Sequence, residues 1–254
     1  MCSAPAYAEL NLWISYHFQG IESFDAGKYH DAEKLLTKAE LETCDAHRDA
    51  FTFDALGRTY TALQNYPAAE EALQKALCLR EEELGEASRF VPATLNNLAD
   101  LHYVAGNKEK VETLYRRALK ITEKDPYSME KSRALNGLAL LAADAGNFAE
   151  AENLLKRAAK VHFLGGRSEH PFMATALTNL GILYTELGRY EEAADSLAHA
   201  KRIHQATIGE NHPDVAVRLH AVAKLKAKMG EAAKAGKYQD KANAIQEHFN
   251  TLNG

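Results

Sequence analysis

The chain of 254 residues has few of the features that mark secreted, membrane-spanning or β-sheet proteins. Its three cysteines, Cys2, Cys44 and Cys78, are odd in number and irregularly spaced, which favours free thiols in a reducing compartment over a disulfide framework. No apolar run reaches the roughly 20 residues that a membrane-spanning helix needs, and the N-terminus lacks the basic and apolar regions of a signal peptide. We therefore expect a cytoplasmic protein without membrane contact; that Cys2 is the lipid-bearing first residue of a processed chain stays an open alternative.

Strand signals and excess positive charge are also lacking. No stretch alternates β-branched with polar residues over a useful length, so no strands are predicted. Only 6 prolines and 15 glycines interrupt a sequence rich in Ala, Leu, Glu and Lys, which favours helix nearly everywhere. The formal net charge of −5 gives no reason to expect nucleic-acid binding, because that function leaves a basic domain as its footprint.

The stretch from Met173 to Ile203 has the clearest pattern. In its first half, apolar and small residues recur at helical spacing and share one face: Leu177, Leu180, Gly181 and Tyr184. The second half repeats this pattern with Ala193, Leu197 and Ala200. Small residues allow the two helices to approach, and large ones fill the space beside them. With Gly188 able to take positive φ between the halves, the stretch predicts a helical hairpin.

Degenerate copies of this hairpin recur along the chain. The equivalent turn residues are Gly27, Gln64, Gly106, Gly146, Gly188 and Gly230. Twelve residues after each turn stands an alanine: Ala39, Ala76, Ala118, Ala158, Ala200 and Ala242. Six matches in six copies predict six hairpins, with boundaries near 6–45, 46–84, 90–125, 127–165, 171–208 and 213–250. No linker divides them, so we expect a single solenoid over residues 6–250 with flexible tails at 1–5 and 251–254.

These patterns resemble the tetratricopeptide repeat. The resemblance is carried by Leu-Gly, Tyr, Gly-x-Tyr and Ala-Leu-Ala positions, best preserved at Leu56–Ala76 and Leu180–Ala200. A period near 42 residues, with ATLNNLADLHY from Ala93 and IGENHPDVA from Ile208, is similar to the kinesin light chain-like subclass. The resemblance implies an all-α fold: a right-handed α-α superhelical solenoid whose concave side is lined by the first helix of each hairpin.

The last hairpin departs from the pattern. Lys226, Ala232 and Gln239 stand where better copies carry Tyr or Leu, as expected of a terminal repeat with no following neighbour. Its basic residues are Lys224, Lys226, Lys228, Lys234, Lys237 and Lys241. Two interpretations of these lysines stay open, a solvated end cap and a patch for an anionic partner.

No convergent set of reactive groups marks an active site, so we predict no enzyme, no catalytic residue, no cofactor and no metal ligand. A metal site at His162, Glu169 and His170 is a weak alternative. The favoured interpretation is that His170-Pro171 and His212-Pro213 shape the loops before helices. Cys78 is expected to fill core space.

The candidate binding surface is the inward face of the first helices. Its predicted peptide-binding residues are Asp54, Arg58, Asn96, Asp100, Tyr103, Arg133, Asn136, Leu140, Thr178 and Ile182. Asparagine amides can donate to and accept from a peptide backbone, and they are poor helix formers without such a role. The resemblance supports this: kinesin light chain-like repeats carry paired asparagines along a peptide groove, which Asn96-Asn97 matches fully and Asn136-Gly137 and Thr178-Asn179 match by half. Asn97 and Asn179 themselves are alternatively assigned to bonds between neighbouring hairpins.

The leading functional hypothesis is a non-enzymatic scaffold that captures a short linear segment of a partner protein. The alternative is a structural module that uses its end faces and groove for self-assembly. Under the first hypothesis the chain is a monomer or a weak homo-oligomer, and under the second it forms larger species as its concentration rises.

Overall fold

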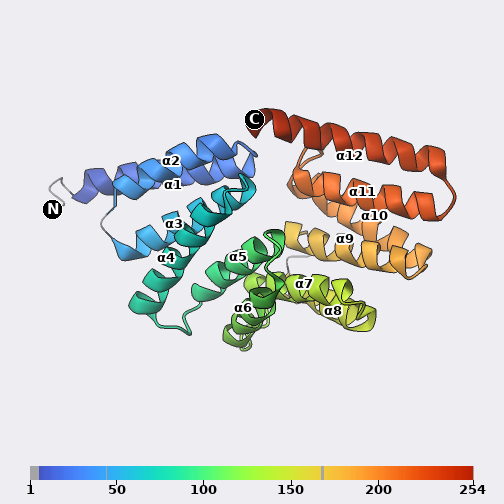
Figure 1. Cartoon of the computed structure of the whole chain (residues 1–254), viewed down its shortest axis with the longest axis horizontal. Helices are drawn as coiled ribbons and strands as arrows, with labels where there is room; N and C mark the ends of the chain where they lie inside the picture. The colour runs from blue at the N-terminus through green and yellow to red at the C-terminus, as the bar shows by residue number, and fades with distance from the viewer. Residues whose placement is uncertain (1–5, 44, 167–168, 254) are drawn as a thin grey trace. The chain divides into compact units, whose positions relative to one another are not determined.

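A computed structural model describes the backbone of residues 6–43, 45–166 and 169–253 (Figure 1). These residues form twelve α-helices and no strand, which confirms the all-α prediction. The helices are α1 (Ala6–Asp25), α2 (Tyr29–Leu41), α3 (Ala46–Ala62), α4 (Tyr66–Leu84), α5 (Val91–Val104), α6 (Lys108–Ile121), α7 (Met129–Asp144), α8 (Phe148–Leu164), α9 (Pro171–Glu186), α10 (Tyr190–Thr207), α11 (Pro213–Lys228) and α12 (Ala232–Asn253).

The helices pair in chain order into the six predicted hairpins, which fall into two compact units. The first unit ends at Ile121 and holds α1–α6; the second begins at Thr122 and holds α7–α12. Within each unit the helices of a hairpin pack on one another, and successive hairpins also pack together. A single solenoid over residues 6–250 stays a prediction. Of the predicted tails, residues 1–5 lie outside the described residues, whereas 251–253 continue α12 as helix.

The hairpin turns lie at the six predicted residues. Each has positive φ, between 59° at Gln64 and 80° at Gly106. Glycine adopts this left-handed conformation without the steric penalty that a Cβ brings, which explains its presence in five of the six turns. Gln64 is the one non-glycine residue with positive φ among the described residues. The turn positions were thus predictable from sequence alone.

Close approach of the paired helices explains the small residues. A Cβ placed on Gly181 of α9 would lie 2.5 Å from Cγ of Leu197 on α10, and Gly57 faces Leu73 in the same way. The alanine that follows each turn by twelve residues is fully buried in all six hairpins. The alternation of small and large residues therefore determines the spacing of the helices, as predicted.

Histidine side chains cap the N-termini of α9 and α11, the first helices of the last two hairpins. Nδ1 of His170 accepts a hydrogen bond from the Phe172 amide at 3.2 Å, and Nδ1 of His212 accepts one from the Asp214 amide at 3.2 Å. Each precedes a proline at the helix start, so the predicted role of the two His-Pro pairs is confirmed.

Cys78 was wrongly predicted to fill core space. Its thiol is free and exposed, and it donates a hydrogen bond to the Glu82 carboxylate at 3.2 Å. Two residues beyond the buried Ala76, position 78 lies on the outward side of α4, where no neighbouring helix covers it.

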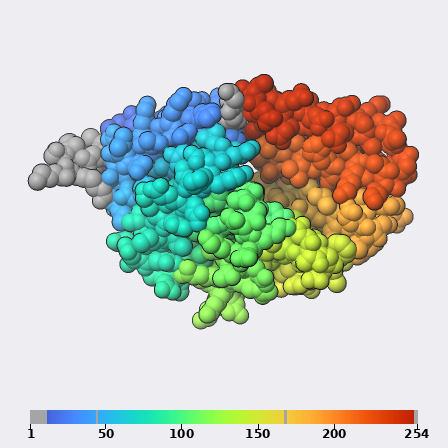
Figure 2. All heavy atoms as spheres, viewed as in Figure 1, coloured from blue at the N-terminus to red at the C-terminus, as the bar shows by residue number. Residues whose placement is uncertain are grey.

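The last helix is largely exposed. Within its hairpin, Val215 and Leu219 of α11 pack against Ala242 of α12. Gln239 and Ala232 face solvent, in agreement with the polar end predicted for a terminal repeat. In the space-filling view the atoms of α11 and α12 form one continuous surface (Figure 2).

Candidate functional site

In the second unit, α7 and α9 lie side by side and share a small depression. It has a volume of about 150 Å³ and is lined by Leu140 of α7, Ile182 of α9 and Phe148 at the start of α8. Leu140 and Ile182, both predicted groove residues, are half-buried there. Asp144 and Glu186 also line it. The structure thus brings two of the predicted apolar residues to one site with an acidic border.

The amides near this depression are used inside the unit. Asn136 is 8% exposed; its Nδ2 donates to the Ser132 carbonyl at 3.3 Å and its Oδ1 accepts from Nδ2 of Asn179 at 3.4 Å. The Asn179–Asn136 bond joins α7 to α9. Asn179 therefore links neighbouring hairpins, which is the alternative role that its sequence position suggested. Thr178, also a predicted groove residue, is buried at 3% exposure. The two asparagines therefore hold α7 and α9 together beneath the surface.

The first unit shows the same arrangement between α3 and α5. Nδ2 of Asn97 donates to Oδ2 of Asp54 at 3.0 Å, and Nη1 of Arg80 lies 3.5 Å from Oδ1 of the same carboxylate. Arg80 is 3% exposed and also donates to the Phe90 carbonyl at 3.0 Å and to the Thr94 hydroxyl. Asn96 is fully buried. Asp54 and Asn96 therefore lie in or beside a polar network that holds two hairpins together.

Three other predicted residues of the first unit are half-buried and reach the surface. The Arg58 guanidinium lies over the Phe24 ring, 4.4 Å from its centroid. Asp100 accepts a hydrogen bond from the Tyr115 hydroxyl, and the Lys108 ammonium lies 5.9 Å from the centroid of the Tyr103 ring. In the second unit Arg133 pairs with Glu130 at 3.2 Å and lies over the Phe172 ring. These side chains are held by neighbours and remain partly accessible.

The comparisons with known proteins agree with the helical hairpins. The model of the tetratricopeptide repeat matches residues 48–124, 90–162, 130–205 and 172–248, which together span most of the chain. This chain belongs to the tetratricopeptide repeat family. None of the curated proteins matches it.

Solved structures with the same fold include kinesin light chain-like proteins. BtubC (BKLC) from P. vanneervenii is 19% identical, with a TM-score of 0.63 over 87% of this chain and 89% of its own. The putative kinesin light chain repeats from Podosopora anserina are 21% identical, with a TM-score of 0.57 over 80% and 97% of the two chains. The Rap protein solved in complex with Competence and Sporulation Factor is 16% identical, with a TM-score of 0.70 over 95% and 76%.

Tetratricopeptide repeat domains generally act as protein-interaction modules, and their scaffold is typically non-catalytic. In this chain, every helix of the described residues is too short or too polar to cross a bilayer. The described residues also contain no group of three His, Cys, Asp or Glu side chains that could hold a metal ion. His162 and His170 stack with ring centroids 5.3 Å apart, and Nε2 of His162 lies 2.9 Å from the Ser132 hydroxyl.

Sequence reasoning missed the buried arginines of this tetratricopeptide repeat protein. Arg80 and Arg218 are 3% and 6% exposed, although arginine is rarely buried without a partner. One signal existed: Arg218 occupies the helix position at which equivalent hairpins carry Ala134 and Ala176, both buried. An arginine at a position that is buried in the other hairpins indicates that its guanidinium needs a partner inside the protein or a ligand.

Proposed function

We propose that the chain is a non-enzymatic scaffold that binds an extended segment of a partner protein across the first helices of its hairpins. The depression between α7 and α9 carries the proposal. Its volume of about 150 Å³ suits one apolar side chain of the partner rather than a whole small molecule, because ligand pockets are generally several times larger.

The border of the depression favours a basic residue next to that apolar side chain. Asp144 is exposed at one side, and Glu186 is exposed where it pairs with Lys224 of α11. A lysine or arginine of the partner competes with Lys224 for the Glu186 carboxylate, and charge-assisted hydrogen bonds of this kind are the stronger ones. The partner motif is therefore an apolar residue flanked by a cation.

The corresponding face of the first unit supports the same mode of binding. Arg58, Asp100 and Tyr103 are half-buried there, and each offers a charged or hydroxyl group from a first helix. A face that combines single charges, hydroxyls and apolar groups suits an extended peptide, because its backbone needs hydrogen bonds and its side chains need apolar or charged contacts. Among proteins of this fold, the Rap structure with its bound factor is consistent with capture of a partner.

The proposal is tested by selecting random peptides displayed on phage against the purified chain, then measuring their binding by fluorescence polarisation. We expect enriched peptides with an apolar residue beside Lys or Arg. Their Kd should lie in the micromolar range, which corresponds to a binding free energy of about −8 kcal/mol. Leu140→Glu should weaken binding at least tenfold, because it places a charge in the apolar depression.

The matched control is Phe163→Glu, which introduces the same charge at a side chain that is 68% exposed on α8 and does not line the depression. It should leave binding unchanged, and circular dichroism should show both variants folded. Ile182→Glu serves as the second variant should Leu140→Glu unfold. Equal binding by the wild-type chain and the depression variants would contradict the assignment, as would the absence of any enriched peptide.

A further inference from the structure

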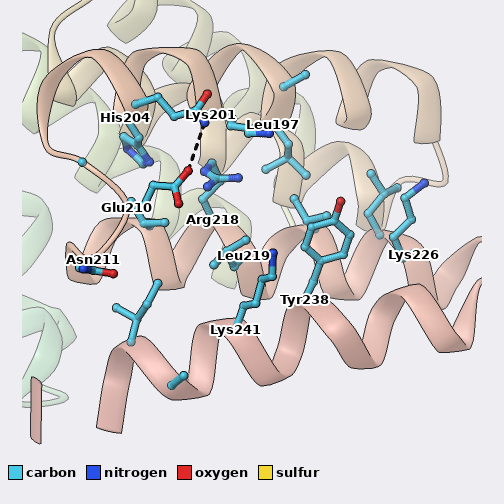
Figure 3. A pocket seen from close by; sticks show the side chains of 18 of the residues that line it. Leu197, Lys201, His204, Glu210, Asn211, Arg218, Leu219, Lys226, Tyr238 and Lys241 are labelled. Atoms are coloured by element: carbon cyan, nitrogen blue, oxygen red, sulfur yellow. Dashed lines mark hydrogen bonds between the residues drawn. The ribbon is translucent and has the colours of Figure 1, made fainter. Parts of the chain in front are cut away.

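A second and larger cavity lies between the second helices of the last two hairpins, away from the depression of the proposed function. It has a volume of about 550 Å³, is open to solvent, and is lined by α10, α11, α12 and the α10–α11 loop (Figure 3). Its apolar lining comes mainly from Leu197, Leu219, Val222, Leu225 and Ile245. This volume is in the range of small-molecule sites, which are mostly apolar with a few placed polar groups.

Arg218 is the first of these polar groups. The residue is 6% exposed, its Nε has no hydrogen-bond partner, and no ion pair among the described residues includes it. Burial lowers the pKa of its guanidinium, an effect that the nearby Tyr238 and Glu210 oppose, and arginine nonetheless stays protonated in proteins. A buried cation without a hydrogen-bonding partner is costly. The burial of Arg218 is therefore explained best by a ligand that enters the cavity and accepts its hydrogen bonds.

His204 on α10 is the second group. Its side chain is 1% exposed and neither ring nitrogen has a hydrogen-bond partner. Burial, more than the neighbouring charges of Arg218 and His212, lowers the pKa of His204 to about 4 against the opposing effect of Asp214. The ring is therefore neutral near pH 7, and its one N–H is a buried donor without an acceptor among the described residues.

The equivalent positions of another pair of hairpins show what a satisfied arrangement looks like. Arg80 and His204 each stand sixteen residues after a turn, and Thr94 and Arg218 each stand twelve before the next. Arg80 donates to the Thr94 hydroxyl and to the Phe90 carbonyl. Arg218, by contrast, lies near the neutral His204 ring and has no hydrogen-bond acceptor among the described residues.

The remaining charges make the cavity positive. Lys226 pairs with Glu231 at 2.9 Å, and Glu210 accepts a hydrogen bond from the Gln205 amide at 3.3 Å. Lys201 and Lys241 line the cavity as exposed cations, and Figure 3 shows Lys241 and Tyr238 reaching from α12 toward α11. Together with Arg218 these cations outnumber Glu210, which is the one carboxylate among the described residues of the lining.

We propose that this cavity binds a small organic carboxylate with an apolar body, its carboxylate held by Arg218 and His204. The guanidinium fork matches the two oxygens of a carboxylate, and the apolar lining accepts the body. The single negative charge of a carboxylate suits the site better than a dianionic phosphate, because Glu210 lies nearby. The site adds a ligand-binding function to the proposed capture of a protein segment and does not depend on it.

The test is isothermal titration calorimetry of the full chain with octanoate, octylamine and acetate, at concentrations where none forms micelles. We expect octanoate to bind with one-to-one stoichiometry, and octylamine and acetate to bind at least tenfold more weakly. Arg218→Met should weaken octanoate binding at least tenfold. Arg202→Met should leave it unchanged, because this variant removes the same charge from an exposed residue of α10 outside the cavity.

A thermal melt of the unliganded variants separates binding from folding. Arg218→Met is expected to melt no lower than the wild-type chain, since it replaces an unpaired buried charge with an apolar side chain. The proposal is overturned if octanoate does not bind, if octylamine binds equally well, or if folded Arg218→Met keeps its octanoate affinity. Should Arg218→Met fail to fold, the comparison of octanoate with octylamine on the wild-type chain decides alone.

Discussion

At the residue scale, Gln64 occupies a left-handed backbone position, with φ of 59°, that glycine holds in the other five hairpin turns. A Cβ in this conformation costs roughly 1–2 kcal/mol, partly offset by the greater entropy that glycine loses on folding. We expect Gln64→Gly to raise the free energy of unfolding by about 0.5–1 kcal/mol. Urea denaturation followed by circular dichroism measures the change.

The reverse substitution is the control for this effect. Gly188→Gln introduces the same side chain at φ 72°, where a Cβ would meet no neighbour within 4 Å, so conformation alone is tested. It should lower the free energy of unfolding by a similar amount. Equal stability of both variants and the wild-type chain would show that backbone conformation at these turns has no measurable cost.

At the element scale, Glu152 of α8 connects three helices. Its carboxylate accepts hydrogen bonds from Arg189, at the start of α10, at 2.7 and 3.2 Å, from Lys156 of α8 at 2.7 Å and from the Tyr184 hydroxyl of α9 at 3.1 Å. Hydrogen bonds from Arg189, then from Lys156, lower the pKa of Glu152 to about 2. The carboxylate is therefore charged in the folded chain at a pH where it is protonated in the unfolded chain.

A pH dependence of stability follows from this contact. Because the folded pKa is depressed, the contribution is complete above the ordinary pKa of about 4.5 and is lost as pH falls toward 2. Glu152→Gln should lower the free energy of unfolding by about 1–2 kcal/mol at pH 7, a difference that shrinks between pH 4.5 and 2. Urea denaturation across this range measures it, with Glu150→Gln on the exposed side of α8 as the matched control. A constant difference at all pH values would contradict the assignment.

At the scale of the whole molecule, a scaffold that holds a partner segment needs no second copy of itself. We expect sedimentation equilibrium to give a mass near 28.0 kDa at all concentrations in the micromolar range. A mass that grows with concentration without any partner would favour the alternative of a self-assembling module. Weakening of such growth by added salt would then assign it to charged residues, such as the lysines of the last hairpin.

The sequence by itself determined the hairpins of this protein, because turns and close helix contacts depend on residues within one hairpin. Gly188, Gly181 and Ala200 mark a turn, a close approach and a buried position, and each shows in the spacing of the chain. The accessibility of polar side chains was decided only by tertiary structure. Asn96 is a surface amide by helical periodicity, yet a neighbouring hairpin buries it completely.

The same distinction applies to the binding sites. The sequence placed Leu140 and Ile182 on one face, but only the packing of α7 against α9 formed the depression that they line. Nothing local to Arg218 shows that its guanidinium is buried without a partner, because the cavity around it is made by three helices. Helix periodicity is a local property of the sequence. The burial of a polar side chain, and whether it finds a hydrogen-bond partner, depend on the side chains of the neighbouring hairpin.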